Sequence, residues 1–499
     1  MNQMKFNAGF LQKPERQSPV AILLILFRFA ITILKQAWPV LLILFLRPSS
    51  FKGDSWTIWV AGFGALSTIA SIIAYFKFYY FVEEDELIIE KGLFQKTRLN
   101  IPFDRIQTIN FRQNPIHRFF NVVSLEIDTA GSKGKEFSIT ALEKDKAEAI
   151  RTFLISQKVD SDTDDPEVNT TVIPDKKLLH LSTIDLIKVG VGQNHLRGLG
   201  IIIGGVFAML EVIESSEKGM MKRIQSIFHE GQELNQPLFI FYATVALILF
   251  LLISSFFMTF LKYYNLQFLR TSKGFKVIAG LLSRREQSAN MEKIQMIRWT
   301  TNPLKKIFSM YDLRLLQASS SRVSRKQAFY IPGIYNHQLS AVREAYFPQE
   351  QLIDFESHGI SKRIIFKRIL LFAIIPMIPG FFFFNVYNSG FIAFVWWLWL
   401  PFIIWTSILY QRNWRYHISA EGIRTTKGIF GRSHTLLKWY KIQGVQKQQS
   451  IFQARRGFTD LQFFTAAGTI TIPYFEEEKA HALMDFALYK VESAREAWM

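Results

Sequence analysis

Long uncharged apolar stretches alternate with polar segments along this chain. Residues 55–76 and 238–261 contain no charged residue, and neither does the longer stretch 369–411. A helix crosses the hydrocarbon core of a membrane with about 20 apolar residues. The first two stretches therefore predict one membrane span each. The third stretch is interrupted by "PMIPG" and "NVYNSG" and predicts a tight helical hairpin.

Weaker apolar segments precede the first two stretches. Residues 20–46 contain Arg28 and Lys35, and residues 198–210 are short for a span. Pairing each segment with the stretch that follows it predicts three hairpins and six spans. An amphipathic helix lying in the membrane interface is the alternative for residues 20–35. Basic residues flank the open ends of the hairpins, which predicts that both termini and the large polar segments are cytoplasmic.

The polar segments contain an internal repeat. "DRIQTI" at 104–109 recurs as "EKIQMI" at 292–297 and as "YKIQGV" at 440–445, and shifts of 188 and then 148 positions align the three copies without a gap. The aligned positions that form the repeat signature are Gly92, Ile106 and Gln107, then Gly280, Ile294 and Gln295, then Gly428, Ile442 and Gln443. We interpret each Ile as a core anchor and each Gln as a partner for strand-end backbone, because buried amides need hydrogen-bond partners.

Each copy of the repeat has the same order of predicted elements. Short segments of alternating apolar and polar residues follow one another, for example "SLEIDTAG", "DLRLLQAS" and "DLQFFTAAG". An amphipathic helical pattern closes each copy, as in "EEEKAHALMDFALYKV". This order predicts a small antiparallel β module with a C-terminal helix.

These features resemble the bacterial pleckstrin-homology-like (bacterial PH, YdbS/YdbT-like) integral membrane proteins. The resemblance rests on four features: the three units of apolar stretch and β module, the glycine turn, the "RIQ/KIQ" strand start, and two segments that precede apolar stretches, "SPVAILL" and "LSTIDLIKVGVG". It implies an α+β membrane protein with three repeats of a transmembrane helical hairpin followed by a PH-like antiparallel β module with a C-terminal helix. Such proteins have no clear role, although some members are linked to resistance against antimicrobial peptides. The resemblance implies no catalytic residues and no phosphoinositide site.

The repeat and the apolar stretches together predict the division of the chain. We expect the N-terminal segment and hairpin one in 1–78, module one in 79–157, an acidic linker in 158–180, hairpin two in 181–262, module two in 263–350, hairpin three in 351–411, and module three in 412–499.

The net charge of +18 is concentrated in the middle of the chain, where residues 262–368 hold 19 basic and 7 acidic residues. A basic surface suits anionic lipid headgroups, an acidic protein or nucleic acid, and the apolar stretches favour headgroups. The candidate contact residues are Arg284, Arg285, Lys305, Lys306, Arg322, Arg325 and Lys326. A solvated face, or a surface for a neighbouring module, would explain the same charges.

The sequence holds no motif for catalysis or for a bound metal. It has no Cys, which excludes disulfides, thiolate metal sites and cysteine nucleophiles. The 9 His lack metal-ligand spacing, and "DSDTDD" lacks the Gly and Glu of a calcium loop. No phosphate loop and no nucleophile elbow are present. We therefore expect no cofactor and no enzyme activity, although a triad assembled from distant residues stays open.

The expected function is that of a scaffold or binding protein in the bacterial cytoplasmic membrane. Its three cytoplasmic modules would contact proteins or anionic lipids, in envelope defence against antimicrobial peptides. A transporter or export accessory for peptides or lipids is the alternative. The expected partners are membrane lipids, a second copy of the chain or a small membrane protein, and not nucleic acid.

Overall fold

The computed structural model describes residues 13–28, 30–32, 55–92, 95–129, 137–161, 176–193, 236–318, 329–348, 357–379 and 390–494. Each copy of the repeat folds as six antiparallel strands followed by a helix, in line with the sequence pattern. A short helix lies between the fourth and fifth strands of every module.

The elements of module one are β1 (Tyr79–Glu83), β2 (Glu86–Lys91), β3 (Thr97–Pro102), β4 (Ile106–Gln113), α3 (Pro115–Phe119), β5 (Val122–Thr129), β6 (Phe137–Glu143) and α4 (Lys144–Ser161). Those of module two are β8 (Gln267–Thr271), β9 (Gly274–Ala279), β10 (Arg284–Asn290), β11 (Ile294–Thr301), α9 (Pro303–Ile307), β12 (Met310–Gln317), β13 (Phe329–Tyr335) and α11 (Asn336–Tyr346). Those of module three are β15 (Arg415–Ile418), β16 (Gly422–Lys427), β17 (Arg432–Lys438), β18 (Gly444–Gln448), α15 (Ile451–Ala454), β19 (Phe458–Thr465), β20 (Gly468–Glu476) and α16 (Glu477–Glu492).

Two additional strands come from segments that lie before the apolar helices. β7 (Lys176–His180) pairs with β8, and β14 (His358–Gly359) pairs with β15. In module one a single bridge between Glu15 and Tyr80 takes the same place. Residues 176–180, which we expected in the acidic linker, therefore belong to the sheet of module two.

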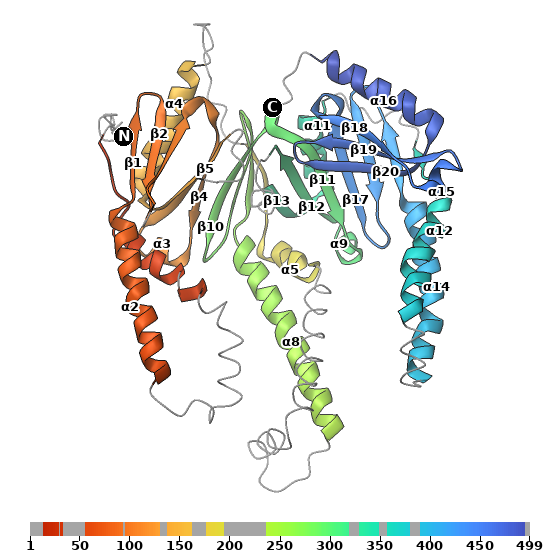
Figure 1. The fold of residues 1–499 in the computed structure, drawn as a ribbon, viewed down its shortest axis with the longest axis horizontal. Helices are drawn as coiled ribbons and strands as arrows, with labels where there is room; N and C mark the ends of the chain where they lie inside the picture. Colours follow the sequence, from red (N-terminus) through yellow and green to blue (C-terminus); the bar gives the residue numbers. More distant parts are fainter. Residues whose placement is uncertain are drawn as a thin grey trace.

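Strand pairing joins the three modules. One seven-stranded sheet has the order β6-β5-β4-β10-β9-β8-β7, and another has the order β13-β12-β11-β17-β16-β15-β14. The second half of module one is thus continuous with the first half of module two, and the second half of module two with the first half of module three. Two three-stranded sheets, β1-β2-β3 and β18-β19-β20, remain at the two ends of the row (Figure 1).

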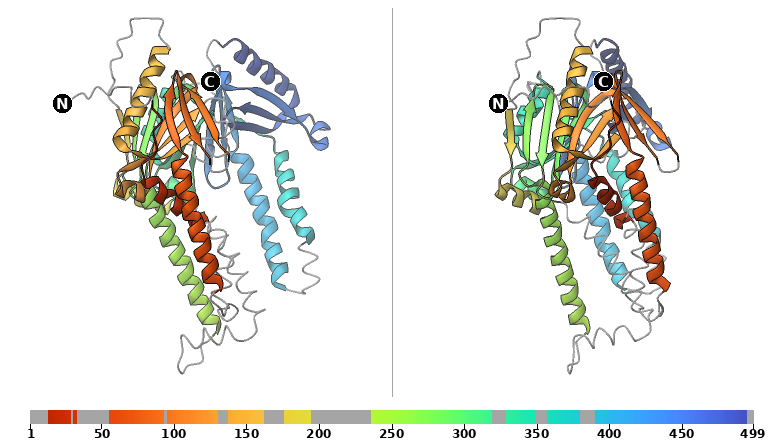
Figure 2. Two further views of the ribbon diagram at one scale, coloured as in Figure 1. Left: turned by 60° about the vertical axis from the view of Figure 1, so that its left-hand side comes forward. Right: turned by 90° about the vertical axis from the view of Figure 1, so that its left-hand side faces the viewer.

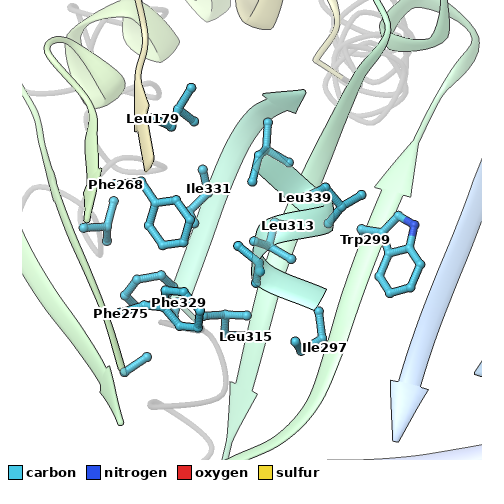
Figure 3. Packing of buried hydrophobic residues seen from close by; sticks show 14 of the residues in the cluster. Leu179, Phe268, Phe275, Ile297, Trp299, Leu313, Leu315, Phe329, Ile331 and Leu339 are labelled. Carbon is cyan, nitrogen blue, oxygen red and sulfur yellow. The ribbon is translucent and has the colours of Figure 1, made fainter. Parts of the chain in front are cut away.

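Each module has its own apolar core, which the closing helix covers. In module two, Phe268, Phe275 and Phe329 pack with Leu313 and Leu315 between the sheet and α11 (Figure 3). The core of module two also includes Leu436 of β17, and the core of module three includes Met296 of β11. Modules two and three therefore share apolar contacts as well as a sheet.

Helices extend from one side of the β layer, as the views in Figures 1 and 2 show. They are α2 (Ser55–Phe76), α5 (Thr183–Val191), α8 (Gln236–Tyr263), α12 (Arg363–Ile369) and α14 (Gly390–Asn413). Large apolar side chains on these helices are exposed, including Leu66, Phe250, Ile253, Leu398 and Trp405.

The structure contradicts the predicted transmembrane hairpins. Among the residues that it describes, no helix combines the length and the apolar character needed to cross a membrane. The third apolar stretch illustrates why an apolar run does not by itself establish a span: α12 ends at Ile369, where a π-helical segment, Leu370–Ile374, follows. Of the two segments expected to complete hairpins one and two, 20–46 and 198–210, residues 33–46 of the first and all of the second lie outside the described residues. The fold-class prediction was wrong in this respect, and the described residues form β modules with helices.

Candidate functional site

Large apolar side chains are exposed on or directly after the short helix of each module. Phe119 is 84% exposed, Ile307 is 75% exposed, and Ile451 and Phe452 are each 73% exposed. Phe120 and Leu304 are also exposed. We call these three places the apolar tips: tip one is Phe119 and Phe120, tip two is Leu304 and Ile307, and tip three is Ile451 and Phe452.

Local sequence explains why the chain turns into a short helix at each tip. Asn114–Pro115 and Asn302–Pro303 place an N-cap residue before a Pro at the first helical position, where a missing N–H costs nothing. The Asn302 side chain accepts a hydrogen bond from the Lys305 N–H at 2.8 Å. In module three, Ser450 forms a capping box with Gln453.

Each tip lies where the projecting helices reach the β layer. In module one, Ile116 of α3 packs against a small cluster with Ala21 and Leu24, to which Tyr75 of α2 also contributes. In module two, the Asn302 amide donates to the Gly192 carbonyl at the end of α5, at 2.7 Å.

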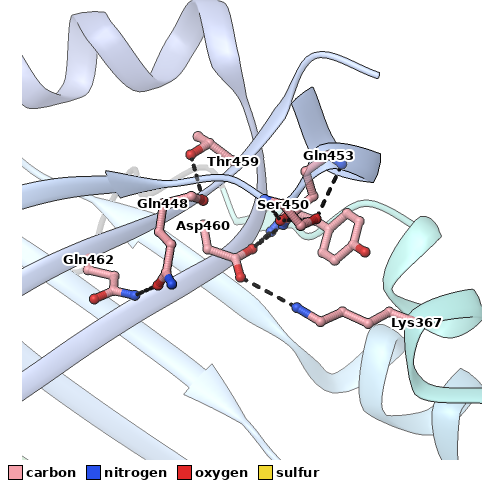
Figure 4. A network of polar contacts seen from close by, with 8 residues as sticks. Lys367, Gln448, Ser450, Gln453, Thr459, Asp460 and Gln462 are labelled. Carbon is pink, nitrogen blue, oxygen red and sulfur yellow. Dashed lines mark hydrogen bonds and ion pairs between the residues drawn. The ribbon is translucent and has the colours of Figure 1, made fainter. Parts of the chain in front are cut away.

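In module three, a polar network joins α12 to the short helix (Figure 4). Lys367 Nζ lies 3.6 Å from one Asp460 oxygen, and Gln453 donates to the other at 2.6 Å. Thr459 Oγ1 donates to the Gln448 carbonyl at 3.1 Å, which fixes the neighbouring strands β18 and β19. Each tip is therefore connected to the base of a projecting helix by packing or by hydrogen bonds.

Exposed basic residues accompany every tip. They are Arg118 beside tip one, Lys306 within tip two, and Arg455 and Arg456 beside tip three. The Arg118 guanidinium donates to the Leu281 carbonyl of module two. An apolar group flanked by cations suits a boundary between anionic headgroups and acyl chains.

A polar pocket of about 240 Å³ lies at the junction of modules one and two. It is lined by the basic side chains of Arg118, Lys144 and Arg284 and by the acidic side chains of Glu148 and Glu286. A second pocket of about 150 Å³ shares Arg118 and Arg284. The junction beside tip one is thus hollowed and predominantly basic.

Glu286 connects the two modules at this junction. Its carboxylate lies 2.6 Å from Arg151 of α4 and 2.7 Å from Lys276 of β9. Burial opposes ionisation of Glu286, but the hydrogen bonds and charges of Lys276 and Arg151 outweigh it and lower the pKa of this carboxyl. The carboxylate therefore stays charged and is not free to bind an added cation.

The described residues of the predicted basic surface of module two lie on two elements, β10 and α9. Arg284 and Arg285 lie on β10, where Arg284 lines the pocket. Burial, and then the nearby Arg112, lower the pKa of the Arg285 guanidinium. Arg322, Arg325 and Lys326 lie outside the described residues.

Lys305 and Lys306 have opposite environments although they are neighbours. Lys306 is exposed, whereas Lys305 is 1% exposed and its ammonium bonds the Asp312 carboxylate. Lys305 therefore supports tip two from inside, and its prediction as a surface contact was wrong.

The signature glycines occupy positions that exclude other residues. Gly92, Gly280 and Gly428 have φ values of +145°, +113° and +151°. A Cβ added at these positions would lie 1.8 to 2.0 Å from the carbonyl oxygen of the residue three positions later. The turn thus requires glycine for both reasons.

The remaining signature residues are structural too. Ile106, Ile294 and Ile442 are buried, which confirms that they anchor the cores. In modules one and two the register of the fourth strand shifts across the Gln, so Gln107 and Gln295 are bulged residues. The Gln443 N–H donates to the Phe464 carbonyl although Gly444 is the residue paired with Phe464, which is a similar irregularity.

The Gln side chains do not share one role. Gln295 is 0% exposed, whereas Gln443 is exposed. The side chain of Gln107 lies outside the described residues. The expectation that these Gln amides are buried is therefore wrong for Gln443, and their hydrogen bonds to strand-end backbone stay a prediction.

Sequence reasoning did not find the apolar tips. The alignment placed Phe120 and Phe308 in one column, which favours a core position, yet Phe120 is exposed and Phe308 only partly buried. A usable signal was present in modules one and two: an Asn–Pro helix start followed within a few residues by large apolar residues and a basic residue. The described residues contain no group of three or more side chains suited to hold a metal ion.

Comparisons with known proteins agree with the repeat. A family model described as "Bacterial PH domain" matches residues 22–158, 222–349 and 370–491. The chain is 22% identical over 463 residues to the UPF0699 transmembrane protein YdbT of Bacillus subtilis, covering 89% of this chain and 91% of that protein. It is 31% identical over 105 residues to the UPF0699 transmembrane protein YdbS of the same organism, covering 19% of this chain and 64% of that protein. No solved structure matches.

Proposed function

The chain belongs to the bacterial PH domain family, and from this premise we propose that it is a membrane-associated binding protein, without catalytic activity, whose modules contact an anionic lipid surface through the apolar tips. The observation that carries the proposal is the recurrence of an exposed apolar tip with adjacent basic residues in all three modules. Recurrence matters because single exposed apolar residues are common on protein surfaces.

The energetics of the tips favour lipid over water. Burying a Phe or Ile side chain contributes about 1.5–3 kcal/mol. A basic residue close to an anionic leaflet adds about 1 kcal/mol. Three tips on modules that share continuous sheets would act together, so weak individual contacts sum to stable attachment.

Two further observations support a membrane surface. The tips and the helices with exposed apolar side chains lie on the same side of the β layer (Figures 1 and 2). The two relatives from Bacillus subtilis are named transmembrane proteins. The transporter alternative has no specific support among the described residues, and envelope defence against antimicrobial peptides stays a prediction.

The lack of Cys makes the proposal directly testable. Single substitutions Phe120→Cys, Ile307→Cys and Phe452→Cys in the full chain would carry an environment-sensitive dye. Tyr489→Cys is the matched control, because Tyr489 is 65% exposed and lies on α16, on the far side of the β layer (Figure 1).

The labelled proteins would be reconstituted into phosphatidylglycerol and phosphatidylcholine vesicles. We expect dye at the tips, and not at position 489, to enter an apolar environment and to be quenched by lipid-bound quenchers. The effect should be stronger in phosphatidylglycerol, and Arg455→Gln with Arg456→Gln should remove this preference at tip three. Dye at all three tips that stays as water-exposed as dye at position 489 would overturn the proposal.

A further inference from the structure

The two pairings between modules use the same pair of strands in the same register. The third strand of module two, β10, pairs with the fourth strand of module one, β4, and Arg284 is opposite Gln113. The third strand of module three, β17, pairs in the same way with the fourth strand of module two, β11, and Arg432 is opposite Thr301. The repeat shifts of 148 and 188 positions convert the first pair of residues into the second, so the junction itself is repeated.

In the part of the chain that the structure describes, each end of the row has one strand of such a junction and no strand from another module beside it. β3 is the counterpart of β10 and β17, and β18 is the counterpart of β4 and β11. Within the described part of the chain, β3 pairs only with β2, and β18 pairs only with β19. Among the described residues, the chain thus has an open third strand at one end and an open fourth strand at the other.

The repeat signature shows the consequence of the open edge. Gln295 is the second residue of β11, which has strands on both sides, and it is buried. Gln443 holds the same position before β18 and is exposed. A strand added to β18 would cover this edge as β17 covers β11.

We propose that β18 of one copy pairs with β3 of a second copy, in the register that the chain already uses twice. This goes beyond lipid binding, because it assigns the partner of the two end modules. Strand addition at an open edge supplies main-chain hydrogen bonds, and opposing side chains select the partner. The contact is heterologous, so it propagates as a ring or as an open row of chains along the membrane.

The repeated register specifies which residues meet. Applying the same shifts places Leu99 opposite Gln446 and Arg98 opposite Lys447. Each cation already has its own carboxylate: Arg98 lies 2.6 Å from Glu83, and Lys447 lies 2.8 Å from Glu477. The four side chains together carry no net charge, yet Arg98 and Lys447 still repel each other directly. Basic residues on edge strands discourage indiscriminate pairing, so this contact is weaker than the two internal junctions.

Cross-linking between two differently marked chains tests the register. One full chain would carry Leu99→Cys and the other Gln446→Cys, mixed in the same vesicles under mild oxidation. Directly opposite Cα atoms in an antiparallel pair lie about 4.5–5.5 Å apart, which is within the Cα separation that a disulfide can bridge. We expect this mixture to form cross-linked dimers at least several-fold faster than a mixture in which Arg98→Cys replaces Leu99→Cys. Equal rates, or no dimer in either mixture, would overturn the proposal.

A charge cycle gives an independent test by measuring association of the full chain in sedimentation experiments. Lys447→Glu turns the opposing pair into Arg98 and a carboxylate, and we expect association to tighten about threefold. Adding Arg98→Glu to that variant restores like charges and should weaken association again. If the single and the double variant changed the association constant equally, Arg98 and Lys447 would not lie opposite each other. That result would contradict the proposed register.

Discussion

The imidazole of His434 stacks on the indole of Trp299, with ring centroids 5.2 Å apart and planes inclined by 13°. The two residues are directly opposite each other on β17 and β11, so this contact belongs to the junction of modules two and three. The Arg343 guanidinium of α11 lies over the Trp299 ring, 5.4 Å from its centroid. His434 Nδ1 also lies 2.9 Å from Thr426 Oγ1.

This environment makes the junction acid-sensitive. Burial, reinforced by Arg424, Arg432, Arg343 and His417, lowers the pKa of His434 to about 4. An unfolded His has a pKa of about 6.5, so between these values the unfolded chain binds a proton that the folded chain does not. Stability is therefore unaffected above about pH 6.5 and should fall by up to about 3 kcal/mol towards pH 4.

Hydrogen exchange of β11 and β17 at pH 7.5, 5.5 and 4.5 would measure this loss after correction for intrinsic exchange rates. His434→Phe is the control, because it keeps an aromatic ring against Trp299 but cannot titrate. We expect the variant to lose much less protection on acidification. Equal acid sensitivity in both proteins would show that other groups control the junction.

Replacing Glu286 should loosen module one from module two. Glu286→Gln removes the charge that Arg151 and Lys276 share, and we expect a loss of about 2 kcal/mol. In the native protein this contribution is present above the unfolded pKa of Glu and is lost as the pH falls through the lowered folded pKa. Protease sensitivity of β4 and β10 would report the loosening.

Glu90→Gln is the matched control for Glu286→Gln. Its partner Lys96 has a side chain that is 74% exposed, and exposed ion pairs contribute little. A similar effect of both substitutions would mean that Glu286 has no special part in joining the modules.

Replacing a signature glycine should destabilise its module. Gly428→Ala combines a φ of +151° with a Cβ only 1.8 Å from the Gly431 carbonyl oxygen, so the turn must rearrange. We expect a loss of about 1–3 kcal/mol, measured as a shift in the unfolding of module three. Gly444→Ala is the control, since a Cβ there meets nothing within 4 Å. Equal stability of both variants would contradict the assigned role of the turn.

Gln295→Ala should lower the stability of module two. Gln295 is 0% exposed in a bulge of β11, and the backbone carbonyl at this bulge accepts a hydrogen bond from the Tyr346 hydroxyl at 2.9 Å. Truncation leaves a cavity and disturbs this bulge, at a cost of about 1–2 kcal/mol. Gln443→Ala, at the exposed counterpart, should cost far less. If Gln295→Ala abolished lipid binding while module two kept its stability, the structural assignment would be wrong.

Local patterns in the chain were sufficient to predict the modules. Alternation of apolar and polar residues identified the strands, the ungapped alignment identified three copies, and Gly92, Gly280 and Gly428 marked the turns. These features depend on backbone geometry and on which face of a strand is apolar. Both are determined by residues that are neighbours in the sequence.

Only the tertiary structure decided which strands are neighbours and which side chains face water. Alternation specifies the two faces of a strand but not the strand beside it, so β10 could be matched to β4 only in three dimensions. The same limit applied to Lys305 and Phe119, because a Lys can be buried when Asp312 pairs with it and a Phe can be exposed at the end of a short helix. It applied to the apolar stretches as well, since counting apolar residues does not determine how a helix continues. Long-range packing settles these points, and its free energy comes from residues far apart in the chain.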